Sequence, residues 1–93
     1  MDELVRYVQS ELSNLANPEN AVQMQAYLKT EMPFYGVKSP ALNEIVSNLK
    51  NLFPVTTQTE YNEIISKIWS LSRREEKYIS VKLALKHKNF ITL

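Results

Sequence analysis

Apolar residues recur at helical spacing along the chain, and proline, glycine and polar capping residues divide them into five segments. The first segment covers residues 2–16, with Asp2 as the predicted N-cap. Asn17-Pro18 ends it, and the same two residues are expected to cap and start a second helix that runs to about Glu31. The apolar stripes of these two helices are Leu4, Val5, Val8, Leu12 and Leu15, and then Ala21, Met24, Tyr27 and Leu28.

Residues 32–38, Met-Pro-Phe-Tyr-Gly-Val-Lys, interrupt the helical pattern because Pro33 cannot continue a helix. This apolar and aromatic stretch predicts a structured connector. Ser39-Pro40 then repeats the signal of a cap followed by proline, and it predicts a third helix that Pro54 stops. The apolar stripe of that helix is Leu42, Ile45, Val46, Leu49 and Phe53.

Two capping-box sequences mark the last two helices. Thr57-x-x-Glu60 predicts the start of the fourth helix, and Ser72-x-x-Glu75 predicts the start of a fifth that runs to about His87. The fourth helix has one apolar stripe, whereas the fifth is apolar on two sides. A surface helix buries one stripe, so the second side predicts a covering layer that truncation has removed, self-association or a partner. The stripe of the fourth helix is Tyr61, Ile64, Ile65, Ile68 and Trp69, and the two sides of the fifth are Tyr78, Val81 and Leu85, and Ile79, Leu83 and Phe90.

Five amphipathic helices with short connections, at a spacing of about 40 residues per helix pair, predict an all-α protein of stacked antiparallel helix pairs of the solenoid type. The length of 93 residues fits a single domain, residues 1–93. Since no strict internal sequence repeat is present, a small helical bundle is the alternative architecture.

The composition fits a small helical domain, because 44% of the residues are hydrophobic, 23% are charged and one is glycine. Cysteine is lacking, which excludes disulfides, thiolate nucleophiles and thiolate metal sites. An acidic start and the lack of a long apolar run argue against a signal peptide and a membrane span, so we expect a cytoplasmic protein. No metal or cofactor is expected, since the single histidine, His87, has no second ligand nearby and is assigned to the dipole at a helix C-terminus.

Charge is unevenly distributed along the chain. Up to Ser66 there are four basic and eight acidic residues, and from Lys67 onward there are seven basic and two acidic residues. The two parts therefore carry charges of −4 and +5, which hints at an anionic partner for the C-terminal part. The alternative is a solvated surface with some pairing to the two acidic residues there, Glu75 and Glu76.

The connector and the segments around it carry a family resemblance. Residues 32–40, Met-Pro-Phe-Tyr-Gly-Val-Lys-Ser-Pro, follow Tyr27-Leu-Lys29 and precede Ile68-Trp69 and Arg74-Glu-Glu-Lys-Tyr78. In order and spacing these residues resemble the N-terminal part of the DNA alkylation repair enzymes, which are DNA glycosylases built from HEAT-like helical repeats. The resemblance implies a HEAT-like α-α superhelix that holds duplex DNA on a basic concave face and excises cationic N3- or N7-alkylated purines.

The catalytic groups that the resemblance implies lie outside this chain. The family uses an Asp and Trp residues of later repeats to stabilise the cationic sugar, and it does not draw the base into a deep pocket. Those repeats would follow Leu93, so no residue here is assigned a catalytic role, and the chain alone is expected to be inactive. A helical-repeat module that lacks the chemistry and binds another protein through the fifth helix is the alternative function.

Contact with the DNA backbone is the function that this chain could retain. Lys38 and Ser39 fall at the N-terminus of the third helix, where backbone N–H groups, a hydroxyl and an ammonium could meet a phosphate. Lys82 and Lys86, stacked on the fifth helix, are the other candidate backbone contacts. The alternatives are a Ser39 that only caps its helix and lysines that are only solvated.

Several aromatic and acidic positions are predicted to be structural. Trp69 continues the apolar stripe of the fourth helix, and Phe34 and Tyr35 are expected to fill the core. Glu75 and Glu76 point in different directions on a helix and are partly explained by the capping box, so a catalytic carboxylate pair is not expected.

Overall fold

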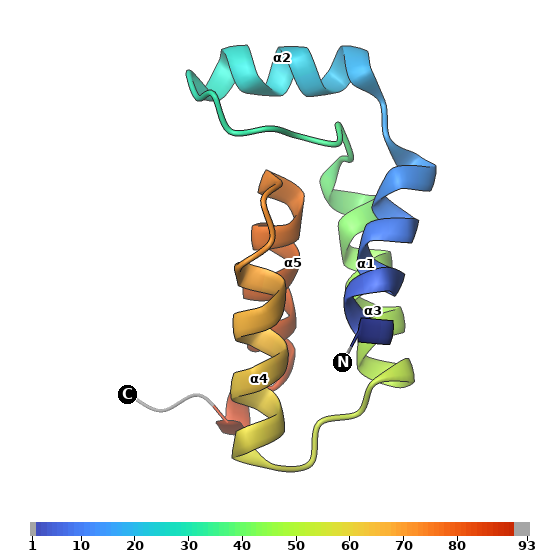
Figure 1. Ribbon diagram of the computed structural model, residues 1–93, viewed down its shortest axis with the longest axis vertical. Helices are drawn as coiled ribbons and strands as arrows, with labels where there is room; N and C mark the ends of the chain where they lie inside the picture. The colour runs from blue at the N-terminus through green and yellow to red at the C-terminus, as the bar shows by residue number, and fades with distance from the viewer. Residues whose placement is uncertain (1, 91–93) are drawn as a thin grey trace.

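The structure of the protein is a computed structural model that describes residues 2–90, and all regular elements within that range are helical (Figure 1). Five α-helices follow one another in these residues, with a short 3-10 helix after the last, so the all-α prediction is confirmed. No helix of this described range is long and apolar enough to cross a membrane. The elements are α1 (Asp2–Leu15), α2 (Pro18–Leu28), α3 (Ser39–Leu52), α4 (Gln58–Trp69), α5 (Arg74–Lys86) and η1 (Lys88–Phe90).

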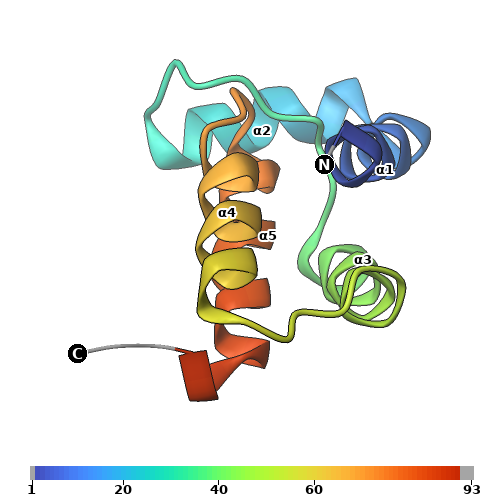
Figure 2. The same ribbon diagram turned by 60° about the horizontal axis from the view of Figure 1, so that its bottom comes forward.

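Four helices form a packed bundle, and α2 lies across one end of it (Figures 1 and 2). α4 and α5 form an antiparallel hairpin, and α3 packs against α5. α1 contacts α3, α4 and α5 and closes the bundle. The connector, residues 29–38, returns from the far end of α2 to the start of α3. The N-termini of α2, α3 and α5 therefore all lie near this connector.

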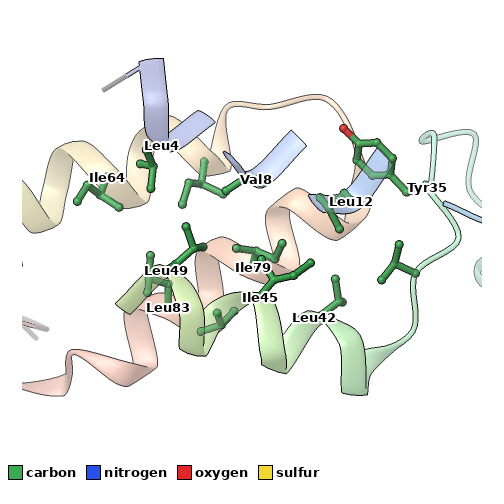
Figure 3. Packing of buried hydrophobic residues seen from close by; sticks show 13 residues of the cluster. Leu4, Val8, Leu12, Tyr35, Leu42, Ile45, Leu49, Ile64, Ile79 and Leu83 are labelled. Atoms are coloured by element: carbon green, nitrogen blue, oxygen red, sulfur yellow. The ribbon is translucent and has the colours of Figure 1, made fainter. Parts of the chain in front are cut away.

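The hydrophobic core lies where α1, α3, α4 and α5 face one another, and Figure 3 shows side chains of all four helices pointing into it. Burial of one Leu or Ile side chain contributes about 1.5–3 kcal/mol to stability, so this cluster supplies most of the driving force for folding. The predicted stripes of these four helices supply the central side chains, but Leu15, the last residue of the α1 stripe, is 49% exposed, so that stripe is confirmed only in part. The apolar side chains that are at most 2% exposed are Leu4, Val8, Leu12, Leu42, Ile45, Val46, Leu49, Ile68, Ile79 and Leu83.

α2 begins as predicted but is shorter and less buried than predicted. The Asn17 side chain caps it by accepting a hydrogen bond from Asn20 N at 3.1 Å. The helix ends at Leu28, before the predicted end near Glu31, because Lys29 adopts the left-handed conformation with φ of 51°. No residue of α2 is buried, and its stripe residue Tyr27 is 86% exposed, so the prediction of a buried stripe is wrong here.

The starts of α3 and α5 are each displaced by one residue from the prediction. Lys38 occupies the N-cap position of α3 without a side-chain cap hydrogen bond, and Ser39 is already helical, so Ser39 is not the N-cap. Arg73, and not Ser72, is the N-cap of α5. The reason is that the Glu76 carboxylate, one residue after Glu75, accepts the hydrogen bond from Arg73 N at 2.8 Å.

α4 begins as predicted but exposes one of its stripe residues. Thr57 Oγ1 accepts a hydrogen bond from Glu60 N at 3.1 Å, which confirms the cap. Tyr61, Ile64 and Ile68 are buried, whereas Trp69 is 51% exposed. The prediction that Trp69 packs in the core is therefore wrong, because Trp69 is the last helical residue, where the bundle ends.

Candidate nucleic-acid interface

A buried carboxylate holds the connector against the start of α5. The Glu75 side chain is 1% exposed, and its oxygens accept hydrogen bonds from three successive backbone N–H groups. Oε1 accepts from Tyr35 N at 2.8 Å, and Oε2 accepts from Gly36 N at 2.8 Å and from Val37 N at 3.0 Å. Because hydrogen bonds to an ionised acceptor are stronger than neutral ones, this group, here called the Glu75 clamp, fixes the backbone of the connector.

Gly36 allows the connector to wrap around that carboxylate. Its φ of +89° lies in a region that side chains disfavour. The residue also lies close to α2, because a Cβ atom at this position would come within 2.0 Å of Asn17 O and 2.9 Å of Ala21 N. On the same side, Asn17 N donates a hydrogen bond to Tyr35 O at 2.9 Å. The prediction of a structured connector is confirmed, and its glycine is needed for both the turn and the close approach.

A second buried carboxylate binds the side chain of Tyr35. Glu76, 1% exposed, accepts a hydrogen bond at Oε2 from the Tyr35 hydroxyl at 3.1 Å. The Arg73 guanidinium carbon lies 4.5 Å from the centre of the Tyr35 ring. Burial, together with the negative charge of Glu76, raises the pKa of the Tyr35 hydroxyl above its usual value. Tyr35 and its neighbour Phe34 are buried, as predicted.

The sequence pattern did not predict that Glu75 and Glu76 are buried; both were expected at the surface, in a capping box or paired with basic residues. The structure corrects this, because the start of α5 at Arg74 places Glu76, and not Glu75, where its carboxylate accepts from the N-cap backbone of Arg73. Glu75 instead accepts from the connector. One signal was available in the sequence. A non-helical apolar connector has backbone N–H groups that need acceptors once it is buried.

Lys38 and Ser39 directly follow the clamped residues in the chain and are exposed at the start of α3. Both line a hollow of about 610 Å³ between α2, the connector, α3 and α5, here called the α2 hollow. Lys82 and Lys86 line a second hollow of about 370 Å³ between α3 and α5. Tyr78, in the first hollow, and Lys82 and Lys86, in the second, are spaced by one helical turn, so both hollows lie on one side of the α3–α5 pair. Lys38 and Ser39 thus line one hollow, and Lys82 and Lys86 line its neighbour; the two hollows together are here called the groove between α3 and α5.

The other basic residues of α5 and its N-cap contact protein groups. The Arg74 guanidinium carbon lies 5.5 Å from the centre of the Tyr78 ring, and its Nε donates a hydrogen bond to the Tyr78 hydroxyl at 3.1 Å. Lys77 Nζ donates to Trp69 O at 2.7 Å and lies 4.9 Å from the centre of the Trp69 ring. Arg73 likewise contacts the ring of Tyr35. Arg73, Arg74 and Lys77 therefore each have a contact within the protein.

His87 is the C-cap residue of α5, as the predicted place at a helix C-terminus requires, and its side chain is buried, which was not predicted. Its side chain is 7% exposed and packs against the rings of Tyr61 and Phe90, with centroid distances of 6.4 and 6.3 Å. Its Nε2 atom is buried without a hydrogen-bond partner among the described residues. Burial, with a smaller contribution from the charge of Lys50, lowers the pKa of His87 below its usual value. The neutral imidazole is therefore favoured in the folded protein.

The second apolar side of α5 is exposed, as the sequence predicted. Ile79 and Leu83 are buried on one side, whereas Val81 is 48% and Leu85 is 53% exposed on the other. Together with Trp69 of α4, Val81 and Leu85 line a hollow of about 340 Å³. Self-association or partner binding through this surface stays a prediction.

The connector, the two glutamates that hold it and the helix order can be compared with known protein families. Residues 8–93 match a family whose description is DNA alkylation repair enzyme. The chain belongs to the DNA alkylation repair enzyme family. Neither the comparison with curated proteins nor the comparison with solved structures gave a match. The family resemblance is therefore confirmed. Of the residues that carry it, the connector and Glu75 build the clamp.

Proposed function

We propose that this chain is the N-terminal part of an alkylpurine DNA glycosylase and contributes to its DNA-binding face. Its role is to bind the phosphate backbone of duplex DNA along the groove between α3 and α5. The chemical task of the whole enzyme is the excision of cationic N3- or N7-alkylated purines, as the resemblance implies.

The observation that carries the backbone proposal is the position of Lys38 and Ser39. They stand at the exposed N-terminus of a helix of 14 residues, directly after a connector that the Glu75 clamp fixes. A helix N-terminus offers free N–H groups and a partial positive charge, and a fixed backbone binds a phosphate with little loss of entropy. Lys82 and Lys86 add two ammonium groups along the same groove.

Binding to duplex DNA tests this proposal through its salt dependence. Lys38→Ala and Lys86→Ala should each weaken binding to any duplex sequence and reduce the slope of log K against log salt by about one. Arg6→Ala is the matched control, because Arg6 is exposed on α1 and lines neither hollow. Affinity that does not fall with salt, or that falls equally in all three variants, would contradict the proposal.

The chain by itself should release no alkylated base. The two carboxylates at the start of α5 cannot stabilise a cationic sugar, since Glu75 and Glu76 are each 1% exposed and already accept hydrogen bonds from protein groups. A glycosylase assay on N3- or N7-methylated DNA checks this point. Release of methylated purine by the purified 93-residue chain would show that it contains an active site of its own.

A further inference from the structure

The α2 hollow has features that backbone contact does not use. Its volume of about 610 Å³ lies in the range of small-ligand pockets. Aromatic side chains from three elements line it, namely Tyr27 of α2, Phe34 of the connector and Tyr78 of α5. Phe34 is almost fully buried, whereas Tyr27 is 86% exposed. The hollow therefore has an apolar floor and an aromatic ring at its opening.

The charge at this hollow favours an anionic ligand. Glu75 is the acidic residue among those that line it, but its carboxylate is 1% exposed and accepts three backbone N–H groups. Lys38 and Ser39 line the same hollow from its α3 side, and both are exposed. A ligand with a flat apolar body and a phosphate at one end matches this arrangement.

We propose that the α2 hollow binds a single unpaired base of a DNA strand whose adjoining phosphate is held by Lys38 and Ser39. The proposal rests on the proposed function, because the same strand follows the groove between α3 and α5. Bases stack on aromatic rings whatever their sequence, and the side-chain amide of Gln23, which also lines the hollow, can pair with a base edge. The base bound here is already unpaired, and it is not the base that is excised.

An apolar side chain of a partner protein is the competing occupant. It would use the aromatic floor of the hollow but make no polar contact with Lys38, Ser39 or the Gln23 amide. The nucleotide uses both the apolar and the polar groups, so the observations favour it.

Fluorescence anisotropy with two labelled duplexes tests the inference, one fully paired and one with a single-nucleotide bulge. The 93-residue chain should bind the bulged duplex about tenfold more tightly, since stacking on an aromatic side chain contributes that much or more. Tyr27→Ala should remove the preference and leave the affinity for the paired duplex unchanged. Val22→Ala is the matched control, because Val22 is 66% exposed on the same helix and does not line the hollow.

The outcomes separate this inference from the proposed function. Equal affinity for the two duplexes would overturn the inference and leave backbone binding intact. Binding of the bulged duplex alone would support the inference and contradict groove binding of paired DNA. Binding of neither duplex would overturn both. A preference for the bulge that Tyr27→Ala does not reduce would also overturn the inference, since the base would then lie elsewhere.

Discussion

At the scale of single residues, Glu75 is the side chain whose hydrogen bonds are expected to contribute most to stability. Its carboxylate accepts hydrogen bonds from the N–H groups of Tyr35, Gly36 and Val37, all of which are buried residues. A buried donor that loses its acceptor costs about 1–3 kcal/mol, so three of them at one acceptor amount to a substantial part of the stability of a small domain.

Glu75→Gln should therefore lower the free energy of unfolding by about 2–4 kcal/mol. The amide keeps the shape of the side chain, but its NH₂ group faces a backbone N–H and cannot accept. Urea unfolding followed by circular dichroism measures the change. Glu63→Gln on the exposed face of α4 is the control and should change stability by less than about 0.5 kcal/mol. Similar values for the two variants would show that the clamp contributes little.

Contacts between residues close together in the sequence could be predicted from it, whereas contacts between residues far apart could not. The caps Asn17 and Thr57 were predicted, because each bonds an N–H three residues later in the chain. The partners Tyr35 and Glu75 are 40 residues apart, and only the tertiary fold brings them together. The prediction that Trp69 is buried in the core was wrong, because helical periodicity alone does not show where the neighbouring helix ends.

At the scale of elements, α2 differs from the other four helices. It buries no residue, and its attachment to the rest of the molecule comes from hydrogen bonds near its two ends, from Asn20 Nδ2 to Gly36 O and from Gln25 Nε2 to Met32 O. A helix without a buried face gains little from tertiary packing. We therefore expect α2 to unfold locally more often than its neighbours. Because α2 forms one wall of the α2 hollow, such opening would give a ligand access to it.

Hydrogen exchange should show this difference directly. Amides in the second half of α2 should exchange about a hundredfold or more faster than those in the middle of α3, because local opening of α2 leaves the core intact. The internal control is α3, whose Ile45 and Leu49 are at most 2% exposed. Equal protection of the two helices would mean that α2 opens only when the whole domain unfolds.

At the scale of the whole molecule, the sequence predicted the five helices but not that α2 stays outside the core. It named the four groove residues without their arrangement. Lys38 and Lys86 lie 48 positions apart, and the packing of α3 against α5 places them on one groove. The α2 hollow was not predicted, since it depends on the crosswise position of α2. The single-domain organisation and the cytoplasmic location stay predictions.

His87 links the stability of the whole molecule to pH. Its pKa in the folded protein is lowered, so as the pH falls below about 6.5 the unfolded chain binds the proton first. The free energy of unfolding should therefore decrease from about pH 7 to pH 5.5, until the pH passes the folded pKa. His87→Phe should flatten this dependence, as urea unfolding at several pH values would show. His87 is the single histidine, so an unchanged slope in the variant would contradict the assignment.

The Glu75 clamp also bears on how the molecule comes apart. In helical solenoids each repeat contacts only its neighbours, and such chains can unravel one repeat at a time. Here the carboxylate of α5, the last α-helix described, fastens a connector that in turn bonds to the start of α2. This link joins elements that are far apart in the sequence, so we expect the four helices of the core to lose their structure in one all-or-none step and not by progressive unzipping. Opening of the second half of α2 does not break the link, because the clamped residues of the connector bond to the start of that helix.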